Sequence, residues 1–371
     1  MKLLAVIKSF MLLSAICISC AVHAVVISNV STDSTTLNLS NGERVTIQFA
    51  LDRPASVALN IYDDRDLLVK RITLGQLETG EHKARWKGDD QLGRPVPPEA
   101  YRYTLSAVGS DQTTGIYDLS DNSAGQVAPL RNLYWDGSTQ SIRYTLAKPA
   151  RVVIRVGLNN HGPLLHTVVN WVARDAGEHS ERWNGSDVSQ VISLAEHPRL
   201  EIAGDGYRLA ENSILVLDTK ARSSLHAQSK PQYIEELKWP IEKRMPQQQN
   251  QHKTYAPAQR SARKRGDFPL QFSLLDTFPM DNGIPQVSGT VAMRINVNPE
   301  DLASIASQRF EPVFFVDGQF LFESEVGYFP MTLNWDSTKH NNGIHYMTAN
   351  LRGYLSNFGM ATIKVEVVND E

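Results

Sequence analysis

The feature that most constrains this chain is a near-duplication inside it. Residues 49–55 (Phe-Ala-Leu-Asp-Arg-Pro-Ala) recur at 144–150 as Tyr-Thr-Leu-Ala-Lys-Pro-Ala, and residues 80–88 recur at 177–185 with six of nine positions identical. Both copies then reach a Tyr-Arg pair, at 101–102 and 207–208. The offset between the copies grows along the chain from 95 to 97 and then 106 residues, as insertions in surface loops would produce. Two units of the same architecture are therefore expected in this chain.

Each copy has the residue pattern of half-buried antiparallel strands. Apolar and polar residues alternate over 57–61 and 152–156, and clusters of Gly, Pro, Asn and Asp separate such runs. The sequence therefore predicts an all-β fold of tandem β-sandwiches, in which Trp86 and Trp183 are large core residues. In the first copy it predicts a tight turn at 63–66 and strands at 44–51, 56–62, 67–73, 82–86 and 101–108.

Three motifs of the first copy resemble one known family. They are Gly-x-His-x-x-x-Trp-x-Gly at 80–88, Gly-x-Pro-Val-Pro at 93–97 and Tyr-x-Tyr at 101–103. This series is similar to the FlgD immunoglobulin-like (Ig-like) domain, which takes its name from the flagellar hook-capping protein. The resemblance implies two Ig-like domains, at 25–110 and 111–219, and a location outside the cytoplasm, but no flagellar role.

The match to this family is incomplete in both copies. The first copy has Asp66 and Ala100 at positions where the family usually has glycine. The second copy lacks the Gly-x-Pro-Val-Pro stretch and has an insertion at 188–205.

Residues 1–24 have the features of a signal peptide. Lys2 and Lys8 supply positive charge, residues 9–22 are apolar, and Val-His-Ala at 22–24 presents the small residues that a signal peptidase requires. We expect cleavage after Ala24. An uncleaved membrane anchor is disfavoured, because the apolar run after Lys8 is shorter than the roughly 20 residues of a membrane span.

Both cysteines of the chain, Cys17 and Cys20, lie inside this leader. Acylation of Cys20 as in a lipoprotein is disfavoured, because Cys17 stands where such signals have a Leu-like residue. After cleavage the chain would contain no thiol, which excludes disulfides, thiol catalysis, iron–sulfur clusters and cysteine zinc sites. We therefore expect a periplasmic or secreted extracellular protein with no membrane span after cleavage.

Residues 220–266 differ in composition from the segments on either side. They contain eleven Lys or Arg and three Glu, a net charge of +8, with scattered Pro and a Gln-rich stretch. Such a segment cannot bury enough apolar surface to fold, so the sequence predicts a flexible basic linker. The rest of the mature chain carries about −13. Export and this acidic body argue against nucleic-acid binding. The basic run at 260–265 is most simply a solvated part of the linker, and it is also a candidate contact for anionic polysaccharide or lipid headgroups, or a site of proteolytic separation of the last domain.

Residues 267–371 predict a third Ig-like sandwich. Asp317-Gly318 is a favoured two-residue hairpin turn between runs at 311–316 and 319–323. Val-Asp-Gly, Pro-Met-x-x-x-Trp-Asp and Asn-Gly-x-His motifs follow in order from 316 to 345. The series resembles Ig-like modules that occur as appendages of secreted bacterial enzymes and adhesins. Further strands are predicted at 288–297, 331–335, 344–351 and 361–367.

Candidate metal ligands are few. His82 and His179 occupy matching positions of the two copies, but neither has a second ligand at a useful spacing. Half-exposed strand positions are the favoured interpretation of both. Asp63, Asp64 and Asp66, with Asp89 and Asp90, form two acidic loops that could suit calcium, but Asp is also an ordinary turn residue. The sequence therefore predicts no metal site and no cofactor.

Catalytic motifs are also missing from the sequence. It contains no nucleophile elbow, no phosphate-binding Gly loop and no zinc signature. Asp317, Asp336 and His345 could be combined into an acid–base set, but both aspartates are turn residues. We therefore predict no catalytic residues and a chain that is not an enzyme.

These observations lead to two hypotheses about function. The first is an exported structural or protein-interaction protein of the bacterial cell envelope, whose partner is a protein bound at sandwich loops or edge strands. The alternative is an accessory carbohydrate-binding component of an extracellular degradative system. It requires a strip of exposed aromatic residues, for which Tyr134, Trp135 and Trp171 are the candidates.

Overall fold

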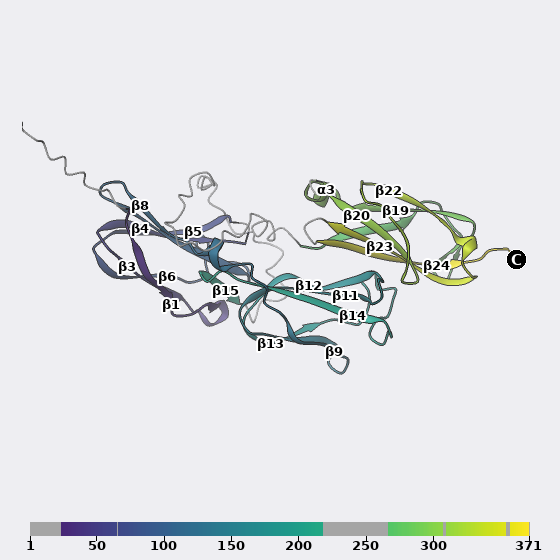
Figure 1. The fold of residues 1–371 in the computed structure, drawn as a ribbon, viewed down its shortest axis with the longest axis horizontal. Helices are drawn as coiled ribbons and strands as arrows, with labels where there is room; N and C mark the ends of the chain where they lie inside the picture. The colour runs from purple at the N-terminus through teal and green to yellow at the C-terminus, as the bar shows by residue number, and fades with distance from the viewer. Residues whose placement is uncertain (1–23, 65, 218–265, 307–308, 354–356, 371) are drawn as a thin grey trace, which may run out of the picture.

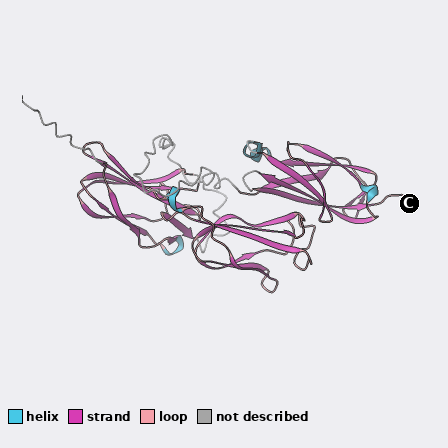
Figure 2. Cartoon of the chain, in the orientation of Figure 1, coloured by secondary structure: helices cyan, strands magenta, loops and turns pink. Residues whose placement is uncertain are grey.

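A computed structural model describes residues 24–64, 66–217, 266–306, 309–353 and 357–370 of the chain. The predicted leader and the predicted linker lie outside these ranges except for their last residues, Ala24 and Gly266. Figure 2 shows that the regular secondary structure of the described chain is almost all strand, which confirms the all-β prediction. In the same residues, no helix has the length and apolar character needed to cross a membrane.

The strands form three β-sandwich domains, which we number in chain order (Figure 1). Domain 1 contains β1 (Ile27–Thr32), β2 (Thr36–Asn38), β3 (Val45–Leu51), β4 (Ala55–Tyr62), β5 (Leu68–Leu77), β6 (Gly80–Trp86), β7 (Ala100–Gly109), β8 (Thr114–Tyr117) and β15 (Ser213–Leu217), with a short 3-10 helix, η1 (Leu39–Asn41). A short helix, α1 (Ser120–Ser123), precedes domain 2, which contains β9 (Arg131–Asp136), β10 (Ser141–Leu146), β11 (Ala150–Leu158), β12 (Leu164–Arg174), β13 (Gly177–Arg182) and β14 (Leu200–Arg208).

Domain 3 contains the remaining elements. They are β16 (Phe268–Leu274), β17 (Met280–Asp281), β18 (Ile284–Val287), β19 (Thr290–Val297), α3 (Pro299–Ala306), β20 (Phe310–Val316), β21 (Gln319–Glu323), β22 (Met331–Asp336), η5 (Ser337–Lys339), β23 (Gly343–Gly353) and β24 (Phe358–Val367).

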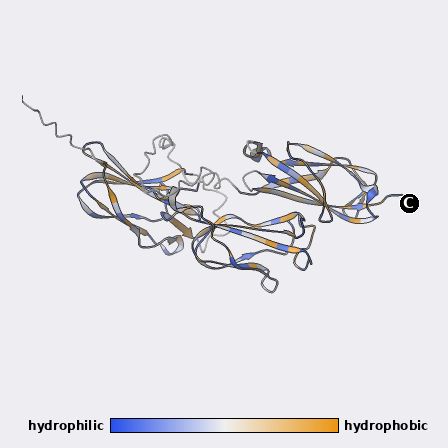
Figure 3. Ribbon diagram, in the orientation of Figure 1, coloured by the Kyte–Doolittle hydropathy of each residue, from blue (hydrophilic) through white to orange (hydrophobic). Residues whose placement is uncertain are grey.

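Domain 1 packs two antiparallel layers around alternating apolar residues. One sheet has the order β1-β3-β6, and the other contains the adjacent strands β5-β4-β7. Along β3 every second residue is buried, and β4 directs Val57, Leu59 and Ile61 into the same core. The two layers thus bury the apolar residues of the alternating pattern that the sequence shows. Figure 3 shows this pattern as a change of hydropathy along the strands.

Domain 2 repeats this arrangement with the sheets β9-β10-β13 and β12-β11-β14. Equivalent pairs also match: Phe49 lies opposite His82 in domain 1, and Tyr144 lies opposite His179 in domain 2. Trp86 and Trp183 are 1% and 4% exposed, which confirms them as core residues. Each indole N–H donates to a backbone carbonyl three residues later, at 2.9 Å in both domains. The sequence duplication therefore corresponds to a duplicated strand order.

The structure corrects the predicted second domain, 111–219, at both ends. β8 pairs antiparallel with β7 of domain 1. β15 pairs antiparallel with β7 and parallel with β2, and Ile214 and Val216 are buried in the core of domain 1. Domain 2 is therefore inserted into domain 1 between β8 and β15. The repeat pattern did not indicate this insertion because β15 follows the last matching motif, the Tyr-Arg pair at 207–208.

Domain 3 is a sandwich in which β16 changes sheets. Its first residues pair parallel with β24, and its remaining residues pair antiparallel with β19. The order β21-β20-β23-β24 forms one layer, and β16-β19-β22 forms the other. The hairpin predicted at Asp317-Gly318 is present, with φ values of 51° and 72°, as a type I′ turn requires. The helix α3 was not predicted, although Pro at its first position and two acidic residues after it are a helix-start signal.

Replacing Ile214 by Ala should destabilise domain 1. Ile214 is completely buried, so the substitution leaves a cavity and should lower the free energy of unfolding by about 2–5 kcal/mol. Hydrogen exchange followed by mass spectrometry should show faster exchange in β4 and β7. A matched Val127→Ala variant changes a side chain that is 66% exposed and should leave the exchange unchanged. Unaltered exchange in Ile214→Ala would mean that domain 1 is stable without β15.

Candidate interaction surfaces

The acidic loops of domain 1 serve turns and ion pairs. Asp63, Asp89 and Asp90 are buried. Asp66 has a left-handed backbone (φ 64°) at the position where the resembling family has glycine. Four carboxylates of these loops have different partners: Asp63 with the backbone N–H of Leu67, Asp66 with Arg102, Asp89 with Lys70, and Asp90 with Arg94. Within the described ranges, no group of three or more His, Cys, Asp or Glu residues is arranged to hold a metal ion.

The matching histidines have the same environment in the two domains. Nε2 of His82 lies 2.7 Å from the carbonyl oxygen of Glu78, and Nε2 of His179 lies 2.9 Å from that of Asp175. Each ring also packs on the aromatic residue opposite it, with centroids 5.7 and 5.1 Å apart. Both side chains are half-buried on strands, as predicted. Their common role is to fasten the turn that precedes β6 and β13.

The structure brings together two of the three residues considered for acid–base chemistry. Nδ1 of His345 lies 2.6 Å from Oδ2 of Asp317, and its Nε2 lies 2.8 Å from the carbonyl oxygen of Asn341. Asp336 instead accepts a hydrogen bond from the backbone of Thr338 and begins η5. Nδ1 of His345 therefore holds the Asp317 hairpin to β23, and Nε2 holds the segment that leads into β23.

The aromatic residues considered for sugar stacking do not form a strip. Trp171 is 8% exposed and stacks on Tyr207 at 5.4 Å. Trp135 is half-buried and packs edge-on against the core residue Trp183 at 4.9 Å. Tyr134 is 51% exposed, but as its neighbour on a strand it points to the other face from Trp135.

Domain 3 is fastened to domain 2 through Asp267, a contact that the sequence did not indicate. The Asp267 carboxylate accepts hydrogen bonds from Nε and Nη2 of Arg155 at 2.6 and 2.7 Å, and from the Thr167 hydroxyl at 2.5 Å. Its backbone N–H and carbonyl both bind the side-chain amide of Asn170. The Arg155 guanidinium also lies 4.5 Å from the ring centroid of Phe358. We call this group of contacts the Asp267 clamp.

Further polar contacts join domain 2 to the outer face of the β20-β23-β24 layer. The side-chain amide of Asn350 binds both the N–H and the carbonyl of Leu164, at 2.8 and 2.7 Å. The hydroxyl of Ser189 accepts a hydrogen bond from the Thr362 N–H at 2.8 Å. Figure 1 shows domain 3 beside β11 and β12. The interface thus buries polar groups in pairs, which fixes how the two domains meet.

The outer edge of domain 3 presents an aromatic strand. β21 ends the strand order of its layer and pairs with β20. Phe320 and Phe322 on this strand are 59% and 39% exposed, and Val326 and Tyr328 in the following loop are 73% and 61% exposed. Large exposed apolar side chains next to an unpaired strand edge are typical of protein-binding surfaces. We call these four residues and β21 the aromatic edge.

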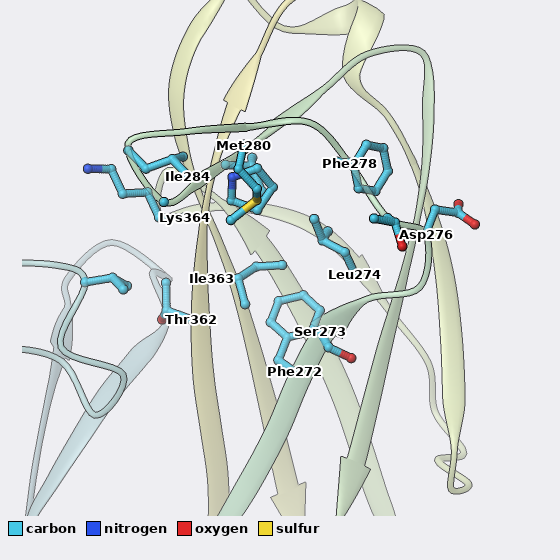
Figure 4. Close-up of a pocket in the computed structure, with 15 residues that line it drawn as sticks. Phe272, Ser273, Leu274, Asp276, Phe278, Met280, Ile284, Thr362, Ile363 and Lys364 are labelled. Atoms are coloured by element: carbon cyan, nitrogen blue, oxygen red, sulfur yellow. The ribbon is translucent and has the colours of Figure 1, made fainter.

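A second surface feature of domain 3 is an apolar pocket of about 620 Å³ where its two layers separate. Figure 4 shows Ile363 of β24 with Phe272 and Leu274 of β16 to its right, and the 275–285 segment with Met280 and Ile284 above. Val191 of domain 2 also lines it. We call it the seam pocket. Its volume lies within the range of about 300–1,000 Å³ found for ligand sites.

Comparison with known proteins identifies one domain of the chain. Residues 34–111 match the model of the FlgD Ig-like domain family. This match confirms the resemblance that the first copy shows, over β2 to β7. No protein among the curated sequences matches the chain.

Several solved structures resemble parts of the chain. FLGD from P. aeruginosa is 25% identical over 33% of this chain and 85% of its own, with a TM-score of 0.21. An endo-β-1,4-mannanase from Thermotoga petrophila is 23% identical over 28% of this chain, with a TM-score of 0.21, and only 20% of the mannanase is covered. Fibronectin(III)-like modules of Clostridium thermocellum CbhA are 10% identical over 92% of this chain and 94% of theirs, with a TM-score of 0.19.

Replacing Asp267 by Asn should weaken the attachment of domain 3. The side chains of Arg155 and Asp267 are only 12% and 5% exposed, so Asp267→Asn leaves a buried guanidinium without its carboxylate. Removing one partner of such a pair costs about 3–5 kcal/mol, which urea unfolding should detect. The double variant with Arg155→Ala should lose less than the sum of the two single losses. Strictly additive losses would contradict the clamp.

The stability of domain 3 should depend on the protonation of His345. Burial works to lower the pKa of this histidine, but hydrogen bonds to the Asn341 carbonyl and the Asp317 carboxylate outweigh burial and raise the pKa above 6.5. A raised pKa stabilises the fold fully below the pKa of the unfolded chain, and this stabilisation disappears as the pH rises through the folded pKa.

A His345→Gln variant tests this dependence. The difference in melting temperature between wild type and His345→Gln should be largest near pH ~5.5 and should shrink towards pH ~8.5. The comparison must keep His166 in both chains, because burial lowers the pKa of His166 and gives the opposite slope. A difference that stays constant over this pH range would contradict the role of His345.

Proposed function

We propose that this chain is an exported, non-enzymatic protein of the bacterial cell envelope that binds another protein through its Ig-like modules. The leader at 1–24 directs it to the periplasm or the cell exterior. In this proposal the second copy is a divergent FlgD-type domain, and domain 3 is a bacterial Ig-like domain. Domains 1 and 2 hold domain 3, which carries the binding surface.

The observation that supports this proposal best is the aromatic edge. An edge strand offers N–H and carbonyl groups to a strand of a partner, and Phe320 and Phe322 add apolar area beside them. A partner strand can pair with the N–H and carbonyl groups of this edge, which a polysaccharide cannot do in the same register, so a protein partner fits it better.

The proposal predicts loss of a protein partner when the aromatic edge is charged. The exported chain is expressed in its own host with a photo-crosslinking residue at Val326, and crosslinked proteins are identified by mass spectrometry. One partner should dominate, and the double variant Phe320→Lys, Phe322→Lys should reduce its yield at least ~10-fold. The matched variant Gln319→Lys, Glu323→Lys changes charge on the same strand and should retain the partner.

The carbohydrate alternative is tested on the same purified chains. Saturable binding on a glycan array that is lost in Tyr134→Ala, together with no dominant crosslinked protein, would replace the proposed function by polysaccharide binding. N-terminal sequencing of the exported chain should begin at Val25. A chain that begins at Met1 and stays in the cytoplasm would contradict the envelope location.

A further inference from the structure

We propose that the seam pocket of domain 3 binds an extended peptide segment of another protein, which adds a strand to the edge of β24. This site lies apart from the aromatic edge, because β21 and β24 occupy opposite ends of the order β21-β20-β23-β24. The proposal therefore goes beyond the proposed function and does not depend on it.

The pocket exists because the outer edge of β24 is paired only at its two ends. β16 pairs with Gly359 and Met360, and β18 pairs with Glu366 and Val367. No described strand pairs with the outer side of β24 at 361–365. About 20 Å of strand separates Met360 from Glu366, a length that suits a peptide of a few residues.

Backbone N–H and carbonyl groups of β24 in this gap point towards the pocket. Strand residues alternate in the side to which their N–H and carbonyl point, and Thr362 donates its N–H outward, to Ser189 of domain 2. Lys364, two residues later, therefore directs its N–H and carbonyl to the same open side. Ser189 of domain 2 already occupies the Thr362 N–H, so the added peptide pairs with the N–H and carbonyl of Lys364.

The side chains around the gap form a complementary apolar wall. Ile363 is partly exposed although it belongs to the core side of β24, because no strand covers it. Phe272 and Leu274 on β16 face Ile363, and Ile284 at the start of β18 lines the pocket above them. An extended peptide that places an apolar side chain at every second position would fill this wall with those side chains.

A peptide fits this combination better than a lipid or a small apolar molecule does. An acyl chain would cover Ile363 and Phe272 but would leave the backbone groups of Lys364 without hydrogen bonds, which is unfavourable once water is displaced. A peptide backbone satisfies those groups while its side chains enter the pocket. The chemistry of the site is therefore that of β-strand addition.

The experiment uses the mature full chain and a display library of peptides of about seven residues. Val, Ile or Phe occupy alternate positions of the peptides, with Thr, Ser or Lys between them. Selected peptides should bind wild type, and hydrogen exchange should slow in the segment that contains Lys364. The same peptide with N-methyl groups on alternate backbone nitrogens, placed on the pairing side, should bind at least ~10-fold more weakly, because it cannot donate to the strand edge.

Two tryptophan variants locate the site. Met280→Trp fills the mouth of the pocket from a side chain that is 61% exposed, so the core is left intact. It should weaken peptide binding at least ~10-fold. Val326→Trp adds the same bulk at the aromatic edge, where the side chain is 73% exposed, and should leave peptide binding unchanged.

Three results would overturn the proposal. They are no selected peptide that binds wild type, equal binding of the N-methylated peptide, and equal binding to Met280→Trp. Palmitate, used as a probe of simple apolar binding, should not displace the peptide. Displacement by palmitate without slower exchange at Lys364 would assign the pocket to lipid instead. Loss of the envelope partner in the Phe320 and Phe322 variant has no bearing on these results, so the two proposals fail separately.

Discussion

The return of β15 to domain 1 is the contact on which the arrangement of this chain depends. Ile214 and Val216 are buried in a core whose other strands precede them by more than 90 residues. Domain 2 must therefore fit between β8 and β15, with two connections to domain 1 rather than one. The return of the chain to domain 1 is also held by Asn212, which is completely buried and donates a hydrogen bond to the Tyr103 carbonyl at 2.6 Å. An inserted domain with two connections has less freedom to move than one on a single linker.

The return of β15 to domain 1 also positions the interface between domains 1 and 2. Leu215, on the opposite side of β15, packs with Ala100 of domain 1 and Ala173 of domain 2 in a small cluster shared by both domains. Arg151 of β11 binds Glu99 beside it at 2.9 Å. β11 and β12 are thus fixed relative to domain 1, and these are the strands that carry the Asp267 clamp. The position of domain 3 consequently follows from a chain of contacts that begins at β15.

Much of the fold could be predicted because it depends on local patterns. The alternation over 57–61, the Asp317-Gly318 turn and the buried tryptophans follow from period-two burial and turn chemistry, which neighbouring residues determine. The insertion of domain 2 could not be predicted. β15 is a short apolar run with no feature that distinguishes pairing in domain 1 from pairing in domain 2, and only long-range register decides between them.

The candidate surfaces were less predictable for a related reason. Arg155 and Asp267 are ordinary charged residues in the sequence. They lie 112 positions apart and in different domains, so their pairing depends on how these two domains meet. Tyr134, Trp135 and Trp171 are prominent in the sequence as candidates for sugar binding. Because tryptophan is large and apolar, Trp171 packs on Tyr207 and Trp135 packs on Trp183 instead. Phe320 and Phe322 were included in a predicted strand, yet exposure depends on which strand ends the sheet. A sequence pattern gives the faces of a strand, whereas edges are properties of the whole sheet.

Sheet edges also explain why both candidate binding surfaces lie in domain 3. In domain 1, β15 and β8 together cover the edge of β7. Domain 2 contacts part of the outer face of the domain 3 layer and the inner face is core, so its two edges remain for strand addition. β21 and the gap in β24 are those two edges, with two strands between them. At about 4.8 Å per strand they lie roughly 14 Å apart, so strands added at both would extend one continuous sheet. Under the two proposals the layer connects two bound segments through its own hydrogen bonds, and the Asp267 clamp fixes its orientation relative to domain 2.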